Sequence, residues 1–191
     1  MADASVGVDP VGAALAFTTP APVTARTAFK EARPLSEQIT ECLKFLRRIE
    51  HVAVSAVVKG DYVIDVYLKD GKGISTPSCS TKQSYKNFIN LHTACVSWSS
   101  RHPDLAPQYG VPKCLYCGPI KDPHAVDQWP SSTDKLFMSK KKMMRVLEAR
   151  LNEYVQAARG EKNGPYLCEG IENIPSLVAV FLLKGVDTST L

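Results

Sequence analysis

Cys114 and Cys117 are separated by two residues, a spacing that suits either a zinc knuckle or a disulfide. A structural Zn²⁺ site needs four ligands in a tetrahedron, and the chain has no second Cys-x-x-Cys. The remaining ligands would have to converge from elsewhere in the chain: Cys95, His92, His124 or Cys168. A structural zinc ion held by Cys114 and Cys117 is one expectation, and buried reduced thiols without a cofactor are the other.

Five basic residues and no acidic residue lie between Lys135 and Arg145. The net charge of the whole chain is only +4, so the positive charge is concentrated in this short segment. Lys140, Lys141 and Lys142 also open a predicted helix, where free backbone N–H groups favour phosphate and other anions. The segment therefore predicts an anion-binding or membrane-facing patch, and an ordinary solvated face is the alternative.

Residue groupings that would indicate an enzyme are weak. Cys114 and His124 could form a nucleophile and its base, but no third residue orients the base. Gly7 and Gly12 have the spacing of a phosphate-binding loop, yet the Lys-Ser or Lys-Thr that completes such a loop does not follow. The basic patch lacks an array of aromatic residues on which nucleic-acid bases could stack. We therefore expect neither an enzyme nor a nucleic-acid-binding module.

Length and composition indicate a single folded domain. The 191 residues are 45% hydrophobic and 22% charged, as in ordinary globular proteins. No run of 18 apolar residues predicts a transmembrane helix, and no basic segment precedes the short apolar stretch 11–17 to make it a secretory signal. The expected location is the cytoplasm, where cysteines stay reduced.

The periodicity of apolar residues predicts a run of strands followed by a run of helices. Residues 1–35 and 187–191 are expected to be disordered tails on either side of one domain, 36–186. Within the domain, the pattern predicts a helix over 36–50, a hairpin over 51–68, a third strand over 74–81, and helices from 83, over 139–158 and over 174–184. Ser36 and Ser139 are predicted to cap the helices that they begin, and Pro175 suits the first turn of the last helix. A loop over 103–130 contains six prolines. This order indicates an α+β fold in which a three-stranded antiparallel sheet packs against a helical subdomain.

The order of elements resembles the PX (phox homology) domain, a phosphoinositide-binding module, over roughly Arg47–Lys184. Residues 83–91 are similar to the family segment Arg-Arg-Tyr-Ser-Asp-Phe-x-x-Leu, with matches at Tyr85, Phe88 and Leu91. Three further segments match the proline-rich loop, the second helix and the closing Val-x-x-Phe-Leu pattern of the family: 103–130, 143–154 and 178–182. The Cys-x-x-Cys and the later Cys168 are similar to those of PX proteins from oomycetes.

The resemblance places the lipid site at residues that differ here from the family. The arginine that grips the 3-phosphate aligns with Ser84, and the arginine that contacts the inositol hydroxyls aligns with Met143. Both differences remove a planar charged group suited to phosphate. The expected replacements are the basic residues nearby in sequence and the lysine of the family's Pro-x-Lys motif: Lys82, Lys86, Lys121, Lys141, Lys142 and Arg145.

Two aromatic residues have two interpretations each. Tyr85 could stack under an inositol ring or belong to the core. Trp129, in the proline-rich loop, could enter the membrane interface or pack against the domain.

The resemblance implies a module that docks from the cytoplasm on phosphoinositide-bearing endosomal or other intracellular membranes, with altered or weakened lipid specificity. The alternative is a scaffold of the same fold that has lost lipid binding and contacts protein partners.

Overall fold

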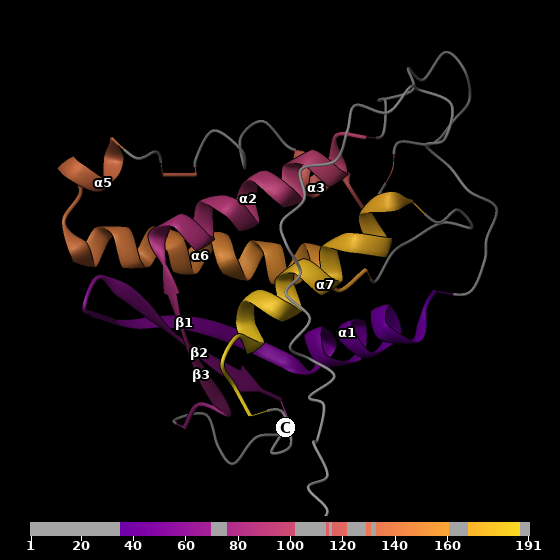
Figure 1. The fold of residues 1–191 in the computed structure, drawn as a ribbon, viewed down its shortest axis with the longest axis horizontal. Coiled ribbons are helices and arrows are strands. Elements are labelled where there is room, and N and C mark those ends of the chain that lie inside the picture. Colours follow the sequence, from indigo (N-terminus) through magenta and orange to yellow (C-terminus); the bar gives the residue numbers. More distant parts are fainter. Residues whose placement is uncertain are drawn as a thin grey trace, which may run out of the picture.

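The computed structural model describes residues 35–69, 76–101, 114, 116–121, 129–130, 133–160 and 168–187. Residues 1–34 and 188–191 of the expected tails, and most of the proline-rich loop, lie outside the described residues. Figure 1 shows the elements, which in chain order are α1 (Glu37–Arg48), β1 (Ile49–Val58), β2 (Asp61–Leu68), β3 (Cys79–Ser84), α2 (Tyr85–Ser99), α3 (Gly118–Lys121), α5 (Asp134–Phe137), α6 (Lys140–Ala158) and α7 (Glu169–Leu183). Strands followed by helices make the fold α+β, as predicted.

The strands form one antiparallel sheet in the order β1-β2-β3, which confirms the predicted hairpin and sheet. A two-residue turn, Lys59-Gly60, joins β1 to β2, and both residues have positive φ angles, of 52° and 90°. Turns of this kind match the right-handed twist of a hairpin. Glycine reaches such a φ without steric cost, which explains its place in the turn.

The third strand lies later in the chain than predicted, at Cys79–Ser84 instead of 74–81. Residues 74 and 75 lie outside the described part, and Pro77 precedes the strand. The sequence of β3 is polar, so apolar alternation could not mark it. Its position comes from pairing with β2, in which Tyr62 lies opposite Gln83 and Asp61 opposite Ser84.

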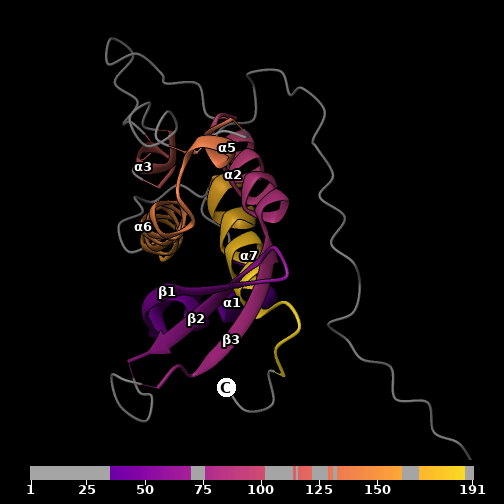
Figure 2. The same cartoon turned by 90° about the vertical axis from the view of Figure 1, so that its left-hand side faces the viewer.

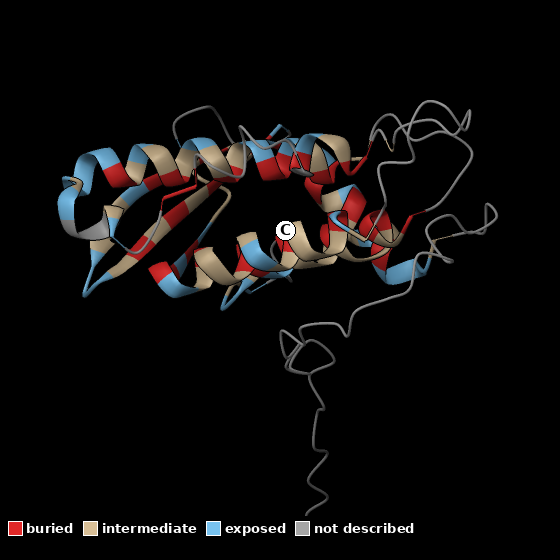
Figure 3. Cartoon of the chain, turned by 90° about the horizontal axis from the view of Figure 1, so that it is seen from above, coloured by how far each residue is buried: buried red, intermediate tan, exposed pale blue. Residues whose placement is uncertain are grey.

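The core lies between the sheet and the helices α2, α6 and α7, which stand above the sheet in Figure 2. The helices turn their buried surfaces inward, toward one another and the sheet (Figure 3). Phe88 of α2 is fully buried at the centre, and its ring meets Tyr62 of β2 at 5.7 Å and Phe181 of α7 at 5.0 Å, edge to face in both cases. Such aromatic contacts add to the stabilisation from burial alone.

The two buried polar side chains of β3 are satisfied by the end of α7. Thr81 Oγ1 donates a hydrogen bond to the carbonyl of Lys184 at 2.6 Å, and Gln83 Nε2 donates to the carbonyl of Phe181 at 2.5 Å. The last carbonyls of a helix have no partner within the helix, so these bonds satisfy groups on both sides.

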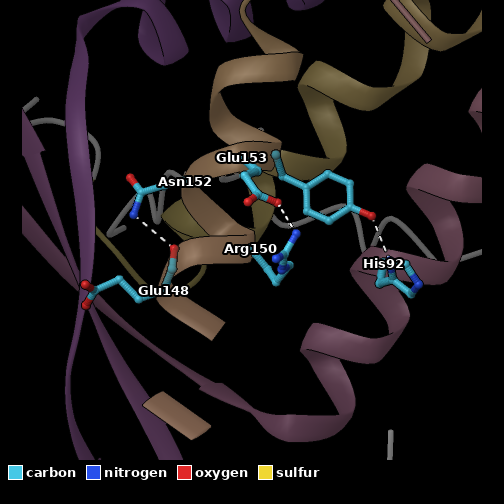
Figure 4. Close-up of polar contacts among 6 residues, drawn as sticks. His92, Glu148, Arg150, Asn152 and Glu153 are labelled. Carbon is cyan, nitrogen blue, oxygen red and sulfur yellow. Dashed lines mark hydrogen bonds and ion pairs between the residues drawn. The ribbon is translucent and has the colours of Figure 1, made fainter. Parts of the chain in front are cut away.

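Side chains of α6 occupy the free edge of β1 (Figure 4). Asn152 Oδ1 accepts the backbone N–H of Val52 at 3.0 Å, while Asn152 Nδ2 donates to the carbonyl of the same residue at 2.8 Å. One turn earlier, Glu148 Oε2 accepts the N–H of Val54 at 2.8 Å. An exposed strand edge invites pairing with other chains, and here helix side chains take the place of a neighbouring strand.

Buried Arg159, just after α6, joins the end of α1 to the start of β1. Its Nε donates to the carbonyl of Leu46 at 3.2 Å, and its Nη2 donates to the carbonyl of Ile49. A guanidinium placed at a helix C-terminus satisfies open carbonyls and suits the helix dipole. The side chain is therefore a structural connection and not a candidate ligand-binding group.

Helices α1, α2 and α6 lie close to their predicted positions. The predicted N-caps are confirmed, because the Ser36 and Ser139 hydroxyls accept the N–H groups of Ile39 and Lys142, each at 3.3 Å. None of the helices within the described ranges combines the length and apolar character needed to cross a bilayer.

The last helix is longer than predicted. It begins at Glu169 instead of 174, so Pro175 lies inside the helix and not in its first turn. The cap explains the difference: Cys168 Sγ accepts the N–H of Ile171 at 3.4 Å, a role that cysteine fills less often than serine or aspartate.

Candidate functional site

Exposed positive charge gathers at one end of the molecule, where both α2 and α6 begin (Figures 1 and 2). We call this surface the basic end. It consists of six exposed residues from the end of β3, the first turn of α2 and the first two turns of α6: Lys82, Lys86, Lys140, Lys141, Lys142 and Arg145. None of the six forms an ion pair with another residue in the described ranges.

The structure brings together all but one of the predicted lysines and arginines. Lys121 is the exception, because α3 lies toward the C-terminal end of α2 (Figure 1), far from the basic end. Two carboxylates share the basic end: Asp61 pairs with Ser84 across the sheet, and Asp134 lies near Tyr85. The net charge of this surface stays positive.

Both helices at the basic end have serine caps and no acidic residue in their first turns. Ser84 Oγ accepts the N–H of Asn87 at 3.3 Å, as Ser139 does for α6. Ser84 therefore has a structural role at the position where the PX resemblance expects an arginine. Met143, at the position of the other expected arginine, is buried with 2% of its surface exposed.

Tyr85 is a core residue in this structure. Only 7% of its surface is exposed, and its hydroxyl donates a hydrogen bond to the carbonyl of Pro130 at 2.6 Å. Burial, with a smaller effect from Asp134, raises the pKa of the Tyr85 phenol. Its ring does not form an exposed platform for an inositol ring.

Of the two interpretations of Trp129, the structure shows packing against the domain, because the indole is only 7% exposed and is not presented to a membrane. It stacks on His92, with ring centres 4.7 Å apart and planes 4° apart, and meets Tyr154 edge to face. His92 Nδ1 and the Tyr154 hydroxyl are 2.7 Å apart and share a hydrogen bond (Figure 4). Burial lowers the pKa of the His92 imidazole.

Phe137, which the sequence analysis overlooked, is the most exposed large apolar side chain among the described residues, at 87%. It ends α5, two residues before Ser139 caps the basic helix α6. Val58, at the hairpin turn on the same end of the molecule, is 42% exposed (Figure 1). An isolated aromatic residue beside a run of lysines was the sequence signal for this feature.

Three thiols form a second cluster away from the basic end. The Sγ atoms of Cys114, Cys117 and Cys168 all lie within 4.8 Å of one another, and Cys117 and Cys168 are 3.7 Å apart. Of the four further ligands considered from the sequence, Cys168 joins the pair, Cys95 and His92 do not, and His124 lies outside the described residues.

The thiol cluster is packed tightly against the start of α7. A Cβ atom built on Gly170 would lie 2.5 Å from Cys117 Sγ, which is closer than real contacts allow. Hydrogen bonding with Cys114 is the main cause of the raised pKa values of the Cys117 and Cys168 thiols. The pKa of Cys168 is raised to about 11, and the pKa of Cys117 is raised further. In the absence of a cation, Cys117 and Cys168 are therefore neutral thiols at neutral pH.

Comparisons with protein-family models, with curated proteins and with solved structures found no match to this chain.

Proposed function

We propose that this protein docks on anionic, phosphoinositide-bearing membranes through its basic end. The observation that carries the proposal is the combination of exposed Phe137 with exposed cations that begin three residues after it, at Lys140. Peripheral membrane proteins commonly combine aromatic side chains that enter the interface with basic side chains that meet lipid headgroups.

The magnitudes support binding that is reversible and sensitive to salt. Each Lys or Arg near an anionic leaflet contributes about 1 kcal/mol, so the six cations together supply on the order of 5 kcal/mol. Phe137, when buried in the interface, adds about 1–2 kcal/mol. A binding free energy of this total size corresponds to reversible association with a membrane.

Weak discrimination among phosphoinositides follows from the kind of cations present. Five of the six are lysines, which act as point charges and lack the planar fork of arginine. Ser84 and Met143, at the positions where the PX resemblance expects arginines, are engaged in a helix cap and in the core. We therefore expect total negative charge on the membrane to matter more than the position of one phosphate.

The experiment is co-sedimentation with vesicles of phosphatidylcholine alone, with added phosphatidylserine, or with one added phosphoinositide. We expect binding to both kinds of anionic vesicle, little binding to neutral vesicles, and a marked loss of binding as salt rises. Phe137→Ser should weaken binding about 5- to 30-fold, the equivalent of about 1–2 kcal/mol. The matched control is Val180→Ser, which removes an exposed apolar side chain from α7.

Negligible binding to every vesicle type would overturn the proposal. The second candidate, a scaffold that contacts proteins and not lipids, would then be favoured. Its supporting observation is that both expected arginine positions hold structural residues, Ser84 and Met143.

A further inference from the structure

We propose that Cys114, Cys117 and Cys168 bind one Zn²⁺ ion. Two thiolates that share a tetrahedral zinc at Zn–S distances of about 2.3 Å have sulfurs about 3.8 Å apart. Cys117 and Cys168 already stand at 3.7 Å, and no pair of sulfurs in the cluster is separated by more than 4.8 Å. The sulfurs therefore need to move by only about 1 Å to surround an ion.

The three ligands come from two segments that are far apart in the chain, as in a metal site that is assembled by folding. Cys114 and Cys117 come from one short turn, where the N–H of Gly118 donates to the carbonyl of Cys114 at 2.9 Å. Cys168 comes from the N-cap of α7, 51 residues after Cys117. The N–H of Ile171 donates to Cys168 Sγ, a contact of the kind that orients metal-bound thiolates.

Gly170 provides a second, independent observation. A glycine inside a helix costs about 1 kcal/mol relative to alanine, so its presence in the first turn of α7 calls for a reason. The reason is space, because any side chain here would collide with Cys117 Sγ and approach Cys168 Sγ to 3.4 Å. The backbone of α7 is thus held close against the sulfurs. Glu169, the residue that follows Cys168, forms an ion pair of 2.9 Å with Arg101, just after α2.

A disulfide accounts for the cluster less well. It would join only two of the three sulfurs and would leave a third thiol buried against it. It would also require the Cys117 and Cys168 sulfurs to approach from 3.7 Å to about 2.05 Å, a larger movement than the ion requires of this pair.

The proposed ion would hold the turn at 114–121 against the start of α7. Each cysteine gives up its proton to solvent as it binds, and the described cysteines supply three of the four ligands that zinc prefers. The fourth position is then completed by water or by another group of the protein. This role is independent of the proposed membrane docking.

The test is the zinc content of the full-length, reduced protein purified without chelator. We expect one zinc per chain in the wild type and in Cys79→Ser, which removes a half-buried thiol of β3 outside the cluster. Cys168→Ser and Cys114→Ser should each lose most of the zinc. Cys114 is only half-buried, so Cys114→Ser tests the proposal even if Cys168→Ser fails to fold.

Replacement of zinc by Co²⁺ gives a second readout. A site with three thiolates in a tetrahedron predicts strong sulfur-to-cobalt charge-transfer absorption that disappears in Cys114→Ser and persists in Cys79→Ser. Wild-type protein that is reduced and folded but contains no zinc, and that fails to bind added Zn²⁺ or Co²⁺, would overturn the proposal. Equal zinc content in all variants, or a disulfide within the cluster under the conditions of purification, would overturn it as well.

Discussion

At the scale of single residues, His92 lies in a largely buried aromatic environment. The imidazole lies against the Trp129 indole and shares a hydrogen bond with the Tyr154 hydroxyl. Burial lowers its pKa, so the folded protein holds His92 neutral at pH values where an ordinary histidine is charged. Protonation is therefore coupled to unfolding at this residue.

The sign of this coupling gives a prediction. As pH falls below about 6.5, histidine in the unfolded chain gains a proton while His92 in the folded protein does not, so the free energy of unfolding decreases. This loss begins at about pH 6.5 and continues down to the lowered pKa of the folded protein. In urea unfolding measured across this range, His92→Asn should lose less stability on acidification than the wild type.

His51→Asn is the matched control, because it removes a histidine that stacks on Tyr67 at 4.3 Å and leaves His92 in place. It should retain the wild-type fall in stability. The same pH dependence in His92→Asn and in the wild type would contradict this account of His92.

Local sequence predicted the roles of some residues and failed for others. Ser36 and Ser139 were identifiable as caps because a cap is a local pattern. The exposure of Trp129 and Phe137 depends on what other segments cover them, which no local pattern records. Trp129 is consequently buried and Phe137 exposed, although both are large aromatic residues.

At the scale of elements, the edge of β1 depends on α6. Asn152 satisfies both the N–H and the carbonyl of Val52, as a neighbouring strand would. Asn152→Ala leaves both groups without this partner, at a cost of about 1–3 kcal/mol in the free energy of unfolding. Chemical denaturation measures the change directly.

The control on the same turn of α6 is Glu153→Ala. Glu153 is more than half exposed and pairs with Arg150 at 2.5 Å, and exposed ion pairs contribute less than about 1 kcal/mol. Equal losses of stability in Asn152→Ala and Glu153→Ala would show that the β1 edge does not need Asn152.

Periodicity predicted the elements that bury a regular apolar face, namely α1, α2, α6 and the hairpin. It failed for β3, whose polar sequence becomes a strand only because β2 lies beside it. It also misplaced the start of α7, because Pro175 suggested a first turn and Cys168 is an uncommon cap. The deciding contact for β3 comes from outside the segment, whereas the start of α7 is decided by a local cap of an uncommon residue type.

At the scale of the whole molecule, the fold brings exposed cations from separate segments together at one end of the described part. The sequence could show that Lys135–Arg145 is strongly basic, but not that Lys82 and Lys86 lie at the same end as the start of α6. The parallel directions of α2 and α6 produce this arrangement, with two helix N-termini facing the same way (Figure 1). Exposed Phe137 lies beside the basic end and adds an apolar side chain to this surface.

The most direct test of membrane docking compares two charge-reversal variants that change the net charge equally. Lys141→Glu with Lys142→Glu alters the basic end. Lys44→Glu with Lys69→Glu alters exposed lysines at α1 and at the end of β2, where the N–H of Lys69 bonds to the carbonyl of Arg48.

The measurement is the affinity of each variant for vesicles that contain phosphatidylserine and a phosphoinositide. We predict that the first variant binds at least about 30-fold more weakly than the wild type, since two lysines near the membrane supply about 2 kcal/mol, and that the second binds nearly as well as the wild type. Equal binding by the two variants would contradict docking through the basic end.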